Sequence, residues 1–198
     1  KPYRLSRNIF YTNYYLAYGK GKEALEVLQK NTKDPEPLAG DIVAGFSKGH
    51  QAARNLSPED DKILMQEIIQ FINRLPPDKL WSYQSKVATI DLESIAGQWQ
   101  PELLAKAQKE AEELVKLSPY LPDPHLLLAK ICILNNKFDE ALKEAQKVLE
   151  LNPYSAPAHF ILFLAYGNKG EIAEADKHLV AAAKLHYPFN NVNVILRV

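Results

Sequence analysis

Apolar positions recur in the second half of the chain at the spacing of amphipathic helices. Residues 137–153 show this most clearly, with apolar side chains at i, i+4, i+7 and i+8: Ala141, Ala145, Val148 and Leu149. This spacing gives a helix one apolar face. The segments 101–119 and 171–188 repeat the pattern, and each of the three has a proline at or near its end. Because proline cannot extend a helical hydrogen-bond ladder, the pattern predicts three helices of similar length.

The three segments align with one another at a constant spacing of about 34 residues, a period found in repeat proteins. A small residue occupies the same place in each: Ala107, Ala141 and Ala175. Two further apolar columns follow it: Ala111, Ala145 and Leu179, then Leu114, Val148 and Ala182. A small side chain allows two helix axes to approach closely, so we expect each helix to pack against a partner helix through this column.

The segments that precede two of these helices also correspond, with matching positions one repeat apart: His125 and His159, Leu128 and Leu162, Cys132 and Tyr166. Asp123 and Ser155 are the expected N-caps, and Gly167 and Gly170 frame a turn. The chain therefore repeats a helix–turn–helix unit, as solenoid proteins do.

This repeat resembles the tetratricopeptide repeat (TPR) family, most clearly over residues 122–188. The resemblance implies an all-α fold, a right-handed α-solenoid of antiparallel helix pairs. His125 and His159 stand where the family usually has an aromatic residue. Since that site packs between the two helices of a unit, a structural role is favoured for both histidines.

The first half of the chain is less regular. Helices are predicted near 38–54, 58–75 and 78–96, and Ser57 with Asp60 has the form of a capping box. With one further unit near the N-terminus, about ten helices are expected. The predicted divisions are an irregular TPR-like region (1–77), a TPR array (78–188, with units near 88–121, 122–155 and 156–188) and a tail (189–198).

Composition narrows the function classes. The 198 residues include 24 Lys plus Arg and 24 Asp plus Glu, and this zero net charge argues against a nucleic-acid partner. One cysteine excludes a disulfide framework and a Cys-rich zinc site. The segment 1–22 is basic and contains no acid, which suits either a juxtamembrane segment or a solvated helix face. Its cations are Lys1, Arg4, Arg7, Lys20 and Lys22. The chain is expected to begin inside a longer protein.

The sequence offers little for catalysis. Cys132 falls on the inward face of a repeat helix, which favours a buried, inert thiol. Glu174 and His178 lie one helical turn apart and are interpreted as a surface contact rather than metal ligands. We therefore predict no catalytic residues, metal or cofactor, and no enzymatic activity for this chain.

The TPR resemblance implies a concave groove lined by the first helix of each pair. Carried over to this sequence, the groove residues are Leu126, Lys130, Ile133, Phe160, Leu164 and Asn168, extended by Leu92 and Trp99. An apolar groove of this kind suits an amphipathic helix of a protein or peptide partner. Some TPR proteins that bind chaperones hold the C-terminal carboxylate of a peptide with a Lys and an Asn. This chain has Leu126 and Phe160 at those positions, so we predict no such clamp. The alternative occupants are this chain's own tail (Phe189, Val192, Ile195) or a second copy.

An aromatic stripe lies near the N-terminus, at Tyr11, Tyr14, Tyr15 and Tyr18, with Phe10 beside it. Packing against neighbouring helices is the favoured interpretation. Contact with lipid headgroups or sugar is the functional alternative, because tyrosine is apolar with one polar tip.

The order of features also resembles the soluble C-terminal extension of the O-antigen ligase and polymerase family. The shared features are a Lys1-Pro2-Tyr3-Arg4-Leu5-Ser6 start, divergent helical segments near 24–28 and 76–93, the stretch Leu117-Ser118-Pro119, and two regular units. This implies a non-catalytic interaction module attached to a membrane protein of cell-surface glycan assembly, with the side of the membrane left open. The alternative is a free-standing TPR adaptor in secretion, pilus or envelope assembly.

Overall fold

The protein is helical throughout the part that the structure describes. The computed structural model describes residues 39–52, 57–75 and 82–189, with single positions between 11 and 27, and contains no strand within them. The all-α class predicted from the periodicity is confirmed. The chain forms two compact units, Lys1–Leu103 and Leu104–Val198. The division falls within one helix, at a different place from the boundary at 77/78 that sequence regularity suggested.

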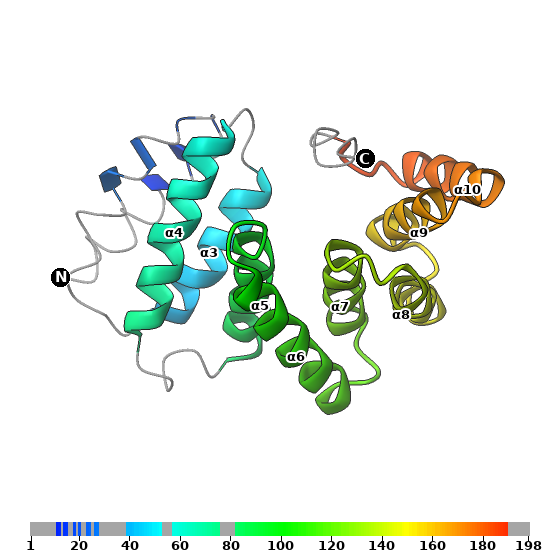
Figure 1. Cartoon of the computed structure of the whole chain (residues 1–198), viewed down its shortest axis with the longest axis horizontal. Coiled ribbons are helices and arrows are strands. Elements are labelled where there is room, and N and C mark those ends of the chain that lie inside the picture. The colour runs from blue at the N-terminus through cyan, green and yellow to red at the C-terminus, as the bar shows by residue number, and fades with distance from the viewer. Residues whose placement is uncertain are drawn as a thin grey trace. The chain divides into compact units, whose positions relative to one another are not determined.

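The first unit contains α3 (Ala39–Ala52), α4 (Pro58–Arg74) and α5 (Tyr83–Ala96) (Figure 1). Both α3 and α4 contact α5. The rings of Phe46 on α3 and Phe71 on α4 meet edge to face, with centroids 5.8 Å apart. Every residue of α5 from 88 to 96 is buried, so this stretch has no solvent-exposed face.

Polar groups join the core of this unit. Asp91 on α5 is buried and accepts a hydrogen bond from the Ser47 hydroxyl of α3 at 2.8 Å.

At the start of α4, the Ser57 Oγ accepts from the Asp60 amide at 3.1 Å, and its hydroxyl donates to the Asp60 carboxylate at 2.8 Å. The predicted cap at Ser57 is therefore confirmed, and it satisfies one of the free amides at the helix start.

The second unit contains most of α6 (Pro101–Leu117), then α7 (Pro122–Leu134), α8 (Phe138–Leu151), α9 (Ala156–Asn168) and α10 (Ile172–Lys184). Figure 1 shows α7 with α8, and α9 with α10, as antiparallel pairs joined by short turns, and each pair packs together. α9 also contacts both α7 and α8. The first helices of successive pairs are thus neighbours.

The small-residue column lies where the sequence placed it. Ala107, Ala141 and Ala175 are 0%, 0% and 2% exposed. Helix–helix contact through these positions explains the constant repeat spacing, because each repeat presents the same face to its partner. Gln108 links α6 to the next pair, since its side-chain oxygen accepts from Asn135 at 2.8 Å and from Lys137 at 3.1 Å.

The turns inside the two pairs are equivalent. Asn136 has φ 57° and Gly170 has φ 79°, the left-handed conformation that asparagine and glycine adopt most readily. After each, an amide reaches back to the preceding helix at 2.9 Å, Lys137 N to Cys132 O and Glu171 N to Tyr166 O. These bonds satisfy carbonyls that the ending helix leaves free.

The predicted caps of α7 and α9 have different outcomes. Ser155 caps α9, with its Oγ accepting from the Ala158 amide at 3.4 Å. Asp123 does not cap α7, because the helix begins one residue before it, at Pro122, and the N-cap Leu121 has no side-chain hydrogen bond. Asp123 instead lies in the first turn, where a carboxylate interacts favourably with the positive end of the helix dipole.

Candidate partner-binding surface

The predicted groove residues of α7 share one face of the helix. Leu126, Lys130 and Ile133 are partly exposed, at i, i+4 and i+7, whereas Leu127, Leu128 and Ile131 are buried beneath them. α7 is apolar on nearly all sides, because the face opposite these three residues packs against α8 in the core. The structure therefore leaves apolar side chains of α7 open to solvent.

The neighbouring helix α9 continues this row in part. Leu164 is partly exposed, and Asn168 is exposed, with its side-chain amide donating to the Leu164 carbonyl at 2.8 Å. Since α7 and α9 contact one another, Leu126, Ile133 and Leu164 lie on successive first helices of the array. We call the set Leu126, Lys130, Ile133 and Leu164 the α7–α9 surface.

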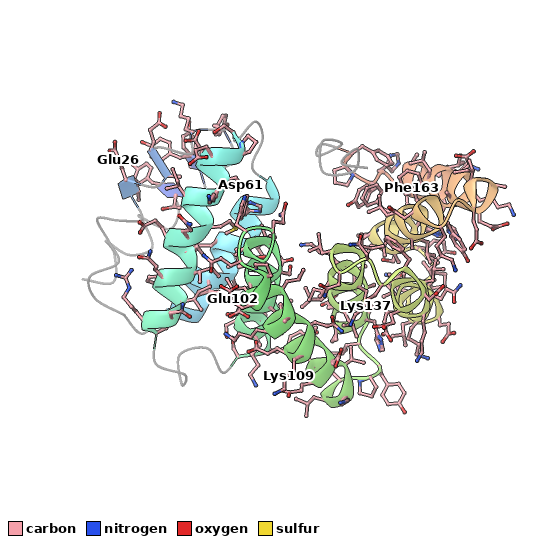
Figure 2. All side chains as sticks on the ribbon, viewed as in Figure 1. Glu26, Asp61, Glu102, Lys109, Lys137 and Phe163 are labelled. Carbon is pink, nitrogen blue, oxygen red and sulfur yellow. The ribbon has the colours of Figure 1, made fainter. Side chains whose placement is uncertain are left out.

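Phe160 lies under the chain's own C-terminal segment. The Tyr187 ring stacks on it, with centroids 4.4 Å apart and an interplanar angle of 18°, and the Phe189 ring meets it edge to face at 6.0 Å. Phe163, labelled in Figure 2, adds a ring contact from the same helix at 5.8 Å. Phe189, one of the tail residues considered as an occupant, thus contacts the predicted groove. Val192 and Ile195 lie outside the described residues.

Two further predicted groove residues belong to the first unit. Leu92 is fully buried in its core, so the prediction that Leu92 lines an open groove is wrong. Its neighbours on α5 are buried too, because this helix is covered all round rather than on one face. Trp99 is partly buried against the same core.

The turns around the α7–α9 surface carry ion pairs. Lys169, after the end of α9, lies 2.5 Å from Asp139 at the start of α8 and 3.4 Å from Glu171. Both acids favour the charged form of the amine, so the pKa of Lys169 is raised, first through its hydrogen bond to Asp139. Because these contacts are exposed, they add little to stability.

Cys132 has the surroundings of an inert thiol. It is 1% exposed, and burial together with the nearby Glu140 carboxylate raises its pKa to about 12. Only the thiolate is a good nucleophile, and at neutral pH this thiol is almost wholly protonated.

The two repeat histidines hold the loops that precede their helices. The His125 Nε2 is 3.0 Å from the Pro119 carbonyl, and its Nδ1 is 2.6 Å from a Glu144 carboxylate oxygen of α8. His159 makes the corresponding hydrogen bond to the Pro153 backbone, and its Nδ1 is 2.9 Å from the His178 Nδ1 of α10. These contacts give both rings the packing role expected from their position between the helices of a unit.

Sequence reasoning missed the partners of these rings, although the signal was present. Glu144 and His178 are themselves one repeat apart, so the same repeat position supplies a carboxylate in one pair and an imidazole in the next. Glu174 pairs with Lys177. The residues that the structure describes contain no group of three or more potential metal ligands.

The N-terminal tyrosines stack on one another. Tyr14 and Tyr18 have ring centroids 4.6 Å apart, and Tyr15 packs against the core of the first unit. Tyr11, Tyr14 and Tyr18 are 41%, 44% and 67% exposed. Phe10 lies outside the described residues.

The helices and their repeated turns define an all-α protein with a TPR-like fold. No family model matches the chain, and no curated protein matches its sequence. Among solved structures, a double mutant of MamA (RS-1) superposes with a TM-score of 0.50 at 14% identity, over 92% of this chain and 94% of that one. MamA (MSR-1) gives a TM-score of 0.49 at 17% identity, over 93% and 95% of the chains. MamA 41-end from Desulfovibrio magneticus RS-1 gives 0.47 at 16%, over 92% and 95%. At 14% identity, the first of these superpositions shows a shared fold alone.

Proposed function

We propose that this chain is a non-catalytic protein-interaction module that binds a partner through the α7–α9 surface. The observation that carries the proposal is the row of partly exposed apolar side chains, Leu126, Ile133 and Leu164, on two contacting helices. Apolar side chains aligned along neighbouring helices gain free energy when a partner removes them from water. An amphipathic helix or peptide with one apolar face fits such a row.

A binding experiment with matched variants tests this proposal. The immobilised full chain is exposed to an extract of the source cells, next to Leu126→Glu, Leu164→Glu and Val180→Glu. Val180 is 52% exposed on α10 and lies outside the α7–α9 surface, so its variant controls for added charge. A partner lost with both surface variants and kept by Val180→Glu supports the assignment. A partner kept by all three rejects it.

Self-association is the competing use of the same surface. Light scattering of the purified chain between micromolar and millimolar concentration separates the two uses. A monomer that binds a partner supports hetero-association. An oligomer that dissociates in Leu164→Glu assigns the surface to a second copy of the chain.

Attachment to a membrane protein of the O-antigen ligase type is the finer proposal. It is supported by the exposed Tyr11, Tyr14 and Tyr18, since tyrosine suits the headgroup zone, and by the basic, acid-free composition of the segment 1–22. None of the described helices is long and apolar enough to cross a bilayer. The free-standing TPR adaptor remains the alternative.

Vesicle sedimentation tests the membrane contact. The chain is expected to sediment with vesicles rich in anionic lipid, and less with zwitterionic vesicles or after Tyr14→Ser with Tyr18→Ser. Equal sedimentation of wild type and double variant contradicts a role for the tyrosines. The sequence encoded upstream distinguishes the ligase-type membrane protein from the free-standing adaptor. Several apolar spans there indicate the ligase type, and a cleaved signal peptide indicates the adaptor.

A further inference from the structure

The last helix pair is held together by two facing imidazoles. His159 on α9 and His178 on α10 have their Nδ1 atoms 2.9 Å apart, a hydrogen-bond distance. Because His159 also bonds to the Pro153 backbone carbonyl, one of its nitrogens carries a proton there and the Nδ1 is free to accept. His178 then donates its Nδ1–H to His159. Both contacts are satisfied when both rings are neutral.

The preceding pair places a different group opposite its histidine. Its His125 faces two oxygen acceptors, the Pro119 carbonyl and the Glu144 carboxylate. The repeat position that holds the Glu144 carboxylate in one pair thus holds the His178 imidazole in the next.

The surroundings of the His159–His178 pair reinforce the neutral form. Desolvation by the packed helices lowers the pKa of both rings below 6.5, and for His178 the neighbouring His159 lowers it further. On α10, Glu174 raises and Lys177 lowers the pKa of His178. On α9, the Tyr166 ring stacks on His178 with centroids 5.6 Å apart and planes at 3°. From the end of α8 the facing group is the Pro153 carbonyl.

We propose that the His159–His178 pair is a proton-sensitive latch between α9 and α10, closed when both rings are neutral and opened when both are protonated. With one ring protonated, the other can still accept at its Nδ1, whereas with both rings protonated neither Nδ1 can accept and the shared hydrogen bond is lost. Two protonated rings at this distance repel one another. The unfolded chain binds these protons more readily than the folded chain, so the latch contributes its full stability above pH 6.5 and loses it as the pH falls through the folded-state pKa values.

Opening the latch changes the aromatic contacts that cover Phe160. α10 leads through Leu185 directly to Tyr187, which lies on Phe160 together with Phe189. Movement of α10 away from α9 therefore uncovers Phe160. If this apolar patch adds to the partner-binding surface, acid enlarges that surface; this consequence alone rests on the proposed function.

Histidine titration in the full chain tests the latch without a partner. NMR of the imidazole C–H signals is followed from pH 8 to pH 4.5 in the wild type and in His178→Glu, which recreates the arrangement of His125 with Glu144. The pKa of His159 is expected below 6.5 in the wild type and higher in His178→Glu, because a carboxylate replaces the neighbouring imidazole. A wild-type value at or above 6.5, or one that the substitution leaves unchanged, overturns the proposal.

Hydrogen exchange of the α10 amides tests the mechanical part. After correction for intrinsic rates, the opening equilibrium of wild-type α10 between pH 7.5 and 5.0 is expected to increase by about tenfold for each pKa unit by which a ring lies below 6.5. In His178→Glu the increase is expected to be smaller, because one titrating ring is removed and the pKa of the other rises. Equal behaviour of the two proteins overturns the latch.

Two further variants keep the test decisive. If His178→Glu fails to fold, His178→Gln takes its place, because it removes one titrating ring while keeping a hydrogen-bonding side chain. It should bring the His159 pKa nearer to 6.5. His186→Asn is the control, since His186 is exposed just beyond α10 and asparagine accepts its φ of 57°. A loss of the pH response in this control contradicts the assignment to His159 and His178.

Discussion

At the scale of single residues, the alanine column decides how closely paired helices approach. Ala141 is fully buried against its partner helix. Ala141→Leu adds three carbon atoms where no space is free, and should destabilise the unit by about 1–3 kcal/mol. Thermal unfolding followed by circular dichroism measures this loss. Lys143→Leu, at an exposed position of the same helix, is the matched control, and equal melting of the two variants would contradict the packing assigned to the column.

Burial also predicts the reactivity of the single cysteine. With its pKa raised to about 12, Cys132 should react with a disulfide reagent at pH 8 far more slowly than a free thiol. In denaturant the same thiol should react at once. Absorbance of the released thiolate measures both rates. Fast labelling of the folded chain would show that α7 opens readily at this position.

Residues that repeat were predictable from the sequence, and residues covered by irregular segments were not. Spacing alone identified Ala107, Ala141 and Ala175 as buried, because a repeated unit buries the same face each time. Leu92 was misplaced because α5 has no solvent-exposed face from 88 to 96, which its periodicity does not reveal. Phe160 was placed on the correct helix, but its cover by Tyr187 depends on how the chain turns after α10.

At the scale of helices, caps were predictable where a serine precedes the first turn and less so beside prolines. Ser57 and Ser155 accept the expected amide hydrogen bonds. Asp123 does not, because Pro122 has a fixed φ suited to the first helical residue and starts α7 earlier. The position of the proline thus outweighed the capping preference of the aspartate.

The Ser57 cap gives a prediction for α4. Ser57→Ala removes the acceptor of the Asp60 amide and should destabilise the first unit by about 0.5–2 kcal/mol. Ser57→Asp keeps an acceptor at the same place and should recover most of that loss. Urea unfolding of the three proteins measures the differences. If the alanine and aspartate variants are equally destabilised, the hydrogen bond is not the cause.

At the scale of the whole molecule, regularity decides how far sequence reasoning reaches. The pairs α7–α8 and α9–α10 fall within the predicted units 122–155 and 156–188, because each contact recurs one repeat later. The first unit has no such repeat to compare. Its buried Asp91 and Glu93 lie on a helix that is covered on all sides, and the polar residues gave no sign of burial in the sequence.

Tyr187 and Phe189 cover Phe160 at the end of the last repeat, and replacing both residues should expose it. Without these rings Phe160 would be exposed, since no further helix pair within the described residues stacks on it. A solenoid needs such a cap, because its terminal unit has an apolar face without a neighbour. Tyr187→Ser with Phe189→Ser removes two ring contacts and should destabilise the α9–α10 pair by about 1–3 kcal/mol.

The same double variant should bind more of an apolar fluorescent dye and associate at lower concentration than the wild type, because Phe160 becomes accessible to water. Dye fluorescence and light scattering measure the two effects. Tyr154→Ser, at a tyrosine that is 79% exposed one repeat earlier, should change neither. If the double variant behaves like this control, the two aromatic residues do not cap the repeat, and Phe160 owes its burial to α9 and α10 alone.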